Sequence, residues 1–407
     1  MTGKDAAHTL LQAQPWFSEP EVRRLLDALA NASIDARFVG GCVRDALLGR
    51  TATDLDLAVD APPDTVTDAL TGHDIKVVPT GIDHGTVTAV LDGRTVEVTS
   101  LRRDVETDGR RAVVRYTKDW REDSLRRDFT VNALYADRDG HLTDFHGGMD
   151  DLTAGRLRFI GDPDQRIRED YLRILRFFRF HAQLGLQTLD APGLEACARL
   201  KERLRDLSAE RVAREMLRLL EAPAPASYLS AMIDGGFLDY WLPEAADVDI
   251  LERLCGLDPT PDSLLRLAAL CPAGPDRMDA IAARLKLSGR DRDRLTALAA
   301  PPPPPADPGA ARAIVYRLGA ALARDQALLA LARGGAEDWT VLRQVAEGWT
   351  PPDFPLSGRD ALAAGMSPGP AVGEILRRIE EDWIAGDFEL DRDGLLRRLK
   401  TMGASDT

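Results

Sequence analysis

The chain has 407 residues and a formal net charge of −14, with 44% hydrophobic and 29% charged residues. This length predicts more than one domain, and no apolar run is long enough to cross a membrane. The four cysteines form no Cys-x-x-Cys pattern, which argues against a zinc site or disulfide framework, and the N-terminus does not resemble a signal peptide. We therefore expect a cytoplasmic protein that binds nucleic acid, if at all, through one local basic groove.

The first 150 residues carry a mixture of helix and strand signals. Residues 21–31 have apolar side chains at helical spacing and lead into an expected strand at Arg37–Val39. Further short β-like runs are Leu55–Val59, Ile75–Val78, Thr86–Leu91, Thr95–Thr99 and Ala133–Tyr135. The turns Asp92-Gly93 and Asp139-Gly140 favour tight hairpins. These signals predict a small α/β head with a mixed sheet in residues 1–150.

Beyond the head the β signals fade and helical periodicity takes over. We expect an all-α remainder that consists of a neck at 151–220, a body at 221–300 and a tail at 301–407. The neck is rich in arginine, and Pro301–Pro305 predicts an extended connector at the start of the tail.

The first chemical signal is a pair of acids beside the strand Leu55–Val59. Asp54 and Asp56 are two positions apart, so both carboxylates point to one face while the leucines point to the core. Such a pair can hold two magnesium ions about 4 Å apart for in-line phosphoryl chemistry. Upstream, Gly41 follows another glycine where the backbone can approach a phosphate, and Arg44 can reach the same anion. An exposed strand with solvated acids is the alternative, but this order of residues favours a nucleotidyl-transfer site.

Two features of the following segment have open interpretations. Glu97 lies in the run Thr95–Thr99, where it is either a third metal-site carboxylate or a solvated strand residue. Residues 102–122 are rich in Arg, Asp and Gly without periodicity, which predicts a mobile loop. That loop is either plain surface or a lever that reshapes the pocket between successive nucleotidyl transfers.

A second motif is Arg126-Arg127-Asp128. Arg127 could contact nucleotide phosphates, and Asp128 could accept a hydrogen bond from a ribose 2′-hydroxyl. The alternative for Asp128 is an Arg–Asp pair that caps a helix.

A third motif places Asp170, Arg173, Arg176 and Arg179 three residues apart, a spacing that lines one face of a helix. A carboxylate beside an arginine can hydrogen-bond the edge of a base, because Asp accepts from an exocyclic amino group while Arg donates to a ring nitrogen or carbonyl. Cytosine and adenine share that amino group, so such a pair would accept CTP and ATP. An i,i+3 salt bridge is the alternative interpretation.

Together these motifs resemble those of the class II tRNA nucleotidyltransferase (CCA-adding enzyme) and poly(A) polymerase family, within the polymerase β-type nucleotidyltransferases. The resemblance implies template-independent addition of C, C and A to the tRNA 3′ end from CTP and ATP, with release of pyrophosphate. It implies two magnesium ions on Asp54 and Asp56, phosphate contacts from Gly41, Arg44, Arg127, Arg176 and Arg179, base contacts from Asp170 and Arg173, and a tail that holds the tRNA elbow.

A further stretch, residues 208–216, resembles a structural helix of the same family. Ser208 is a suitable N-cap, and Arg211 and Glu215 have the spacing of an i,i+4 ion pair. We expect this helix to serve as a scaffold.

Four alternatives follow from the same residues. A poly(A) polymerase is less favoured because the chain lacks a strongly basic C-terminal extension, and a CC-adding enzyme is disfavoured by the intact arginine-rich loop. A non-catalytic RNA-binding paralogue would have lost Asp54 or Asp56. A nucleotidyltransferase for small molecules would not need the base-reading face or the helical C-terminal half.

Overall fold

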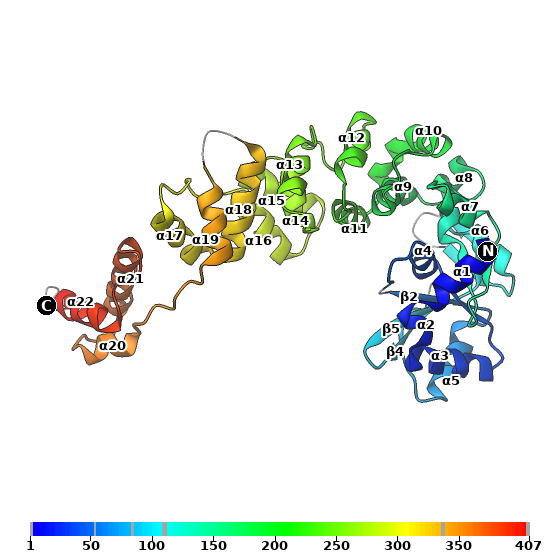
Figure 1. Cartoon of the computed structure of the whole chain (residues 1–407), viewed down its shortest axis with the longest axis horizontal. Helices are drawn as coiled ribbons and strands as arrows, with labels where there is room; N and C mark the ends of the chain where they lie inside the picture. The colour runs from blue at the N-terminus through cyan, green and yellow to red at the C-terminus, as the bar shows by residue number, and fades with distance from the viewer. Residues whose placement is uncertain (1–2, 53, 83–84, 108–111, 335–337, 404–407) are drawn as a thin grey trace. The chain divides into compact units, whose positions relative to one another are not determined.

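The computed structural model describes residues 3–52, 54–82, 85–107, 112–334 and 338–403, and the chain divides into two compact units. The first unit contains Met1–Leu219 with Gly235–Phe237, and the second contains Leu220–Asp234 with Leu238–Thr407. Figure 1 shows that the strands lie in the blue-to-cyan N-terminal part and that the remainder is helical. The expected fold class, an α/β head followed by an all-α remainder, is confirmed. The boundaries of neck, body and tail stay a prediction.

The head is built on a mixed seven-stranded sheet with the order β3-β4-β5-β2-β1-β8-β9. Its strands are β1 (Ala36–Val39), β2 (Leu55–Val59), β3 (Lys76–Gly81), β4 (Thr86–Leu91), β5 (Arg94–Ser100), β8 (Leu134–Ala136) and β9 (Leu142–Asp144). Only β2 and β5 pair in parallel, whereas the other neighbours are antiparallel. The predicted strands are all present, and Gly93 and Gly140 adopt the positive φ of tight hairpin turns.

Helices cover the sheet and supply its hydrophobic core. They are α1 (Gly3–Gln12), α2 (Pro15–Ser18), α3 (Pro20–Asn31), α4 (Gly41–Leu47) and α5 (Pro63–Thr71). The predicted amphipathic helix corresponds to α3, which buries Val22, Leu25 and Leu29 against this core. Trp16 packs on Phe38 of β1 with ring centroids 4.7 Å apart. This packing makes the strand that carries Asp56 a rigid support.

Residues 102–122 do not form the irregular loop that we expected from the sequence. Wherever the structure describes them, they form a hairpin of β6 (Arg102–Thr107) and β7 (Ala112–Tyr116), followed by α6 (Trp120–Leu125). The pairing register shifts between Asp104 and Glu106. Such a bulge breaks the alternation of side chains, which explains why no strand period is visible in the sequence. Residues 108–111 lie outside the described part.

The helices that complete the first unit are α7 (Gly148–Thr153), α8 (Pro163–Glu169), α9 (Leu172–Leu184), α10 (Ala191–Leu200) and α11 (Ala209–Leu220). Phe129, which directly follows Asp128, contacts Phe159 and Phe180 with centroid distances of 4.8 and 5.6 Å. Phe159 also stacks on Phe177 at 5.6 Å. This aromatic cluster fixes α9 against the Arg-Arg-Asp segment.

The second unit is entirely helical in its described residues. Its helices are α12 (Ala226–Asp234), α13 (Asp249–Leu257), α14 (Ser263–Leu270), α15 (Pro275–Arg284), α16 (Gly289–Leu298), α17 (Pro308–Leu318), α18 (Ala320–Arg333), α19 (Thr340–Gly348), α20 (Gly358–Ala363), α21 (Pro370–Ala385) and α22 (Arg392–Gly403). As predicted, Pro301–Pro305 forms a non-helical connector between α16 and α17. Among the described helices, none has the length and apolar character needed to span a membrane.

Candidate active site

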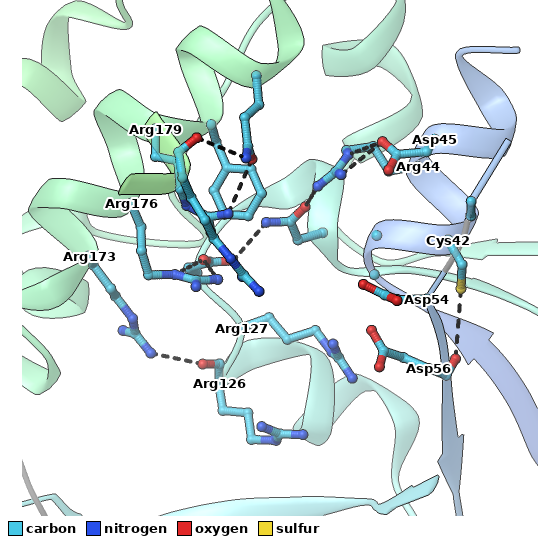
Figure 2. A pocket seen from close by; sticks show the side chains of 18 of the residues that line it. Cys42, Arg44, Asp45, Asp54, Asp56, Arg126, Arg127, Arg173, Arg176 and Arg179 are labelled. Carbon is cyan, nitrogen blue, oxygen red and sulfur yellow. Dashed lines mark hydrogen bonds and ion pairs between the residues drawn. The ribbon is translucent and has the colours of Figure 1, made fainter. Parts of the chain in front are cut away.

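The paired acids lie at the start of β2. Asp54 directly precedes the strand and is exposed, whereas Asp56 lies within it and is half-buried. Leu55 and Leu57 point into the core with exposures of 2% and 0%. The predicted alternation is therefore present, and Figure 2 shows the two carboxylates next to each other in one pocket.

Glu97 is brought beside this pair by the sheet. It is the β5 residue in register with Asp56 on β2, and the two strands are parallel, so both side chains leave the same face. Burial raises the pKa of Asp56 to about 6, with further contributions from the negative charges of Glu97 and Asp54, while Arg127 opposes the rise. Three neighbouring carboxylates thus repel one another where a cation would relieve the repulsion.

The glycine turn and α4 form another wall of the pocket. Gly40 has φ +76°, and a Cβ there would lie 3.8 Å from Nη1 of Arg127. Gly41 begins α4, from which Arg44 reaches Asp45 at 2.8 Å and donates to Oδ1 of Asn132 at 2.7 Å. These contacts hold the Arg44 guanidinium at the pocket wall.

A fully buried carboxylate, Asp123, holds the two arginines of the second motif. It accepts hydrogen bonds from Nε of Arg126 at 2.7 Å and from the Tyr135 hydroxyl at 2.8 Å, and Nη2 of Arg127 lies 3.3 Å away. The backbone N–H of Arg102, the first residue of β6, donates to it at 3.3 Å. Burial raises the pKa of Asp123, but the charges of Arg127 and Arg126 outweigh burial and lower it to about 2.

Asp128 is engaged by α9. Its carboxylate pairs with Arg176 at 2.6 Å and accepts from Nδ2 of Asn132 at 3.1 Å and from the Phe129 N–H at 2.8 Å. The pKa of Asp128 falls to about 2 because Arg176 and these donors outweigh its burial. The Arg–Asp pair of the alternative interpretation exists, but it joins two distant segments and does not cap a helix.

The third motif departs from the predicted helix face at one residue. Arg173, Arg176 and Arg179 lie on α9, but Asp170 precedes the helix with an extended backbone. Oδ1 of Asp170 accepts the N–H of Leu172 at 3.1 Å, so the carboxylate serves the helix end. Asp is a poor interior residue and a good capping residue, which explains where the helix starts.

The helix at 208–216 contributes more than a scaffold. Arg211 on α11 pairs with Asp170 at 2.7 Å, and Glu215 pairs with Arg179 at 2.5 Å. The expected ion pair between Arg211 and Glu215 is wrong, because both side chains have partners on the α8–α9 segment. Arg173 has its own partner, Glu169, at 2.8 Å.

These walls enclose a cavity of about 560 Å³, within the range of small-molecule sites. All nine residues predicted for the site line it: Gly41, Arg44, Asp54, Asp56, Arg127, Asp170, Arg173, Arg176 and Arg179. Seven arginines and five aspartates face the cavity, so its charge suits a polyanion.

Comparison with known proteins identifies the family. A family model described as "Poly A polymerase head domain" matches residues 36–158, and one described as "Probable RNA and SrmB- binding site of polymerase A" matches 188–248. "CCA tRNA nucleotidyltransferase 1, mitochondrial" of Mus musculus is 32% identical over 95% of this chain and 91% of its own length. The "CCA-adding enzyme" of Levilactobacillus brevis is also 32% identical, over 92% of this chain and 96% of its own length.

The chain belongs to the CCA-adding enzyme family. In agreement, the solved CCA-adding enzyme of Bacillus stearothermophilus in complex with CTP is 28% identical, with a TM-score of 0.75 over 97% of this chain and 99% of that one. A Thermotoga maritima CCA-adding enzyme complexed with tRNA, 18% identical with a TM-score of 0.65, shares the fold.

Four residues of the site were not predicted from the sequence. Asn132 and Arg218 line the cavity, and Asp123 and Glu215 hold its arginines from behind. Asn132 and Asp123 were visible only as neighbours of the Arg-Arg-Asp motif. Arg218 and Glu215 lie on a helix whose spacing indicates only amphipathicity, so the sequence carried no signal for their place in the site.

A second set of ligand-type side chains lies in the turn between β8 and β9. Asp137, Asp139 and His141 lie close enough to one another to share an ion. Asp137 already accepts the N–H groups of Asp139 and His141 at 2.9 and 2.8 Å, so the turn itself accounts for the arrangement.

We expect Asp123→Asn to lower the free energy of unfolding by about 2 kcal/mol at pH 7. Because the folded-state pKa of Asp123 lies at about 2, below its usual value, this contribution is present above pH 4 and is lost as the pH falls towards 2. Thermal melting of wild type and variant between pH 7 and 2.5 measures it. Glu122→Gln on the same helix removes only the exposed pair with Arg103 and should cost less than about 1 kcal/mol. An equal effect of both variants, or a difference independent of pH, would contradict the role of Asp123.

Proposed function

We propose that this protein adds C, C and A to the 3′ end of tRNA without a template, using CTP and ATP and releasing pyrophosphate. The observation that carries the proposal is the gathering of all nine predicted residues, from four separate chain segments, around one cavity. The full-length relatives named as CCA-adding enzymes support the same activity. A cytosolic location remains a prediction, and the Mus musculus relative is named as mitochondrial.

The acidic end of the cavity fits magnesium. Asp54, Asp56 and the adjacent Glu97 offer only carboxylate oxygens, which hard divalent cations prefer. Burial is the main cause of the raised pKa of Asp56, and the negative charges of Glu97 and Asp54 raise it further, so a cation bound there would relieve their repulsion. We assign two ions to Asp54 and Asp56, with Glu97 as a supporting carboxylate. When bound, magnesium would lower the pKa of the RNA 3′-hydroxyl and neutralise the charge of the leaving pyrophosphate.

The basic wall would hold the triphosphate. Gly41 leaves room for a phosphate beside the backbone, and Arg44, Arg127, Arg176 and Arg179 face the cavity from three segments. Each of these arginines is held by a carboxylate behind it, so its orientation is set before the nucleotide arrives. Such preorganisation lowers the entropic cost of binding and of reaching the transition state.

Asp170 and Arg173 would read the base. Arg211 and the Leu172 N–H each donate a hydrogen bond to one carboxylate oxygen of Asp170. Each oxygen keeps a further lone pair that can accept from an exocyclic amino group. The Nη1 group of Arg173 donates hydrogen bonds to the Glu169 carboxylate and to the Arg166 carbonyl. Its Nη2 group donates one hydrogen bond to the Arg126 carbonyl. Among the residues that the structure describes, its Nε–H and its second Nη2 hydrogen have no acceptor, so they would be available to the base.

The test is extension of an unmodified tRNA transcript that ends before CCA, with magnesium and with CTP and ATP supplied separately and together. Two added residues with CTP alone and three with both nucleotides are expected when products are resolved at single-nucleotide length. A ladder of A residues from ATP alone would make the protein a poly(A) polymerase, and a stop after two C residues with both nucleotides would make it a CC-adding enzyme. Failure to extend any RNA would overturn the enzyme hypothesis.

A further inference from the structure

One arginine of the cavity differs from the other six in its electrostatic environment. Six of the cavity arginines have a carboxylate oxygen within 4 Å, in the pairs Arg44–Asp45, Arg126–Asp123, Arg127–Asp123, Arg173–Glu169, Arg176–Asp128 and Arg179–Glu215. Arg218 has no such partner among the residues that the structure describes, and its side chain is exposed at the cavity. It is therefore the cavity arginine with an uncompensated positive charge.

Arg218 lies at the Arg179 end of the cavity. Gln183 connects the two residues, since its Oε1 accepts from Nη1 of Arg179 at 3.1 Å and its Nε2 donates to the Arg218 carbonyl at 3.5 Å. Burial lowers the pKa of Arg179 to about 10, and the like charges of Arg176 and Arg218 contribute to the decrease against the opposing effect of Glu215. Two cationic groups, one from α9 and one from α11, thus line the same cavity and repel each other, and a bound anion would relieve this repulsion.

The direction of α9 suggests which part of the nucleotide this end receives. Arg173 and Arg179 are six residues apart on the helix, so they are separated by about 9 Å along its axis. A nucleotide with its base at Arg173 and its phosphates at Arg176 and Arg179 runs along this helix. Gln183, which contacts the Arg218 backbone, is one turn beyond Arg179 on α9, so a phosphate chain continuing in this direction would approach Arg218 with its outer phosphates.

We propose that Arg218 is an additional phosphate-binding residue that contacts the outer phosphates of CTP and ATP and the pyrophosphate formed from them. This proposal rests on the proposed function. The other six arginines must share their guanidinium groups with internal carboxylates, whereas Arg218 gains its first ionic partner when the nucleotide binds. Its contribution is therefore to the affinity for triphosphate and pyrophosphate and leaves base selection and the primer unaffected.

The experiment compares Arg218→Gln with Arg214→Gln. Arg214 is one turn earlier on α11 and is also exposed, but it does not line the cavity, so the control removes an equal charge from the same helix. In Arg218→Gln we expect the KM for CTP and for ATP, and the inhibition constant of pyrophosphate, to rise about tenfold, which corresponds to about 1.4 kcal/mol. The KM for tRNA, the choice of CTP over UTP and the melting temperature should not change, and Arg214→Gln should match wild type.

Three outcomes would overturn the proposal. A raised KM for tRNA with unchanged nucleotide and pyrophosphate constants would make Arg218 a primer contact, and equal effects of both variants would reduce it to a general surface charge. Calorimetric titration of CTP and of pyrophosphate, each with magnesium, separates this proposal from the proposed function. Weaker binding by Arg218→Gln would support the phosphate contact even if the wild type did not extend tRNA, whereas absence of binding to wild type would overturn both.

Discussion

Replacement of Asp56 by asparagine is expected to lower the rate of CTP addition to tRNA about a thousandfold, which corresponds to about 4 kcal/mol of transition-state stabilisation. Asparagine keeps the size of the side chain but removes the charge that would hold magnesium beside Asp54. Because Leu55 and Leu57 remain in the core, the strand itself should not be disturbed. Single-turnover addition at saturating CTP and magnesium measures the effect.

The matched control for this experiment is Asp64→Asn, an exposed acid in the first turn of α5 that does not line the cavity. It should retain the wild-type rate. Magnesium should also raise the melting temperature of wild type and of this control but not of Asp56→Asn, because the ions bind only the native carboxylates. An Asp56→Asn protein within tenfold of the wild-type rate would exclude Asp56 as a magnesium ligand essential for the reaction.

The second large effect is expected from Asp170→Asn, which should reduce the preference for CTP over UTP about a hundredfold, in line with about 1–3 kcal/mol for one base-edge contact. The carboxylate accepts from the amino group of cytosine, whereas the Nδ2 of asparagine can donate to the carbonyl that uracil presents at the same position. The ratio of kcat/KM for CTP and for UTP, measured on a tRNA transcript that ends before CCA, gives the result.

Arg211→Gln tests whether such a change comes from the base contact or from disturbed packing. This variant removes the ion pair with Asp170 at 2.7 Å but leaves the carboxylate in place. It should slow addition of both nucleotides without changing their ratio. If Asp170→Asn lowered kcat/KM for CTP and UTP by the same factor, Asp170 would be a structural residue of the α8–α9 junction and not a base reader.

The local features of this site could be predicted because they depend on short spacings. Leu55–Val59 and Thr86–Leu91 match the observed strands residue for residue. Thr86–Leu91 alternates buried and accessible side chains over its whole length, and Leu55–Leu57 alternates at the start of the first strand, where the acids lie. The pairing of acids at β2 and the three arginines on α9 follow from the same periodicities. The hairpin at 102–116 could not be found in this way, because a bulge interrupts its period.

The sequence by itself determined the face of β2 that carries the acids and the face of α9 that carries the three arginines, because a spacing of two or three residues sets the direction of a side chain wherever the element forms. Only the tertiary structure decided which acidic side chain pairs with which arginine. Asp128 and Arg176 are 48 residues apart and Asp170 and Arg211 are 41 apart, yet both pairs join within the first unit. The packing of α9 against Phe129 and of α11 beside α9 selects these contacts, since an ion pair forms wherever the fold brings opposite charges together. The same reason explains why only the fold shows that Arg218, within the described part of the chain, has no carboxylate partner.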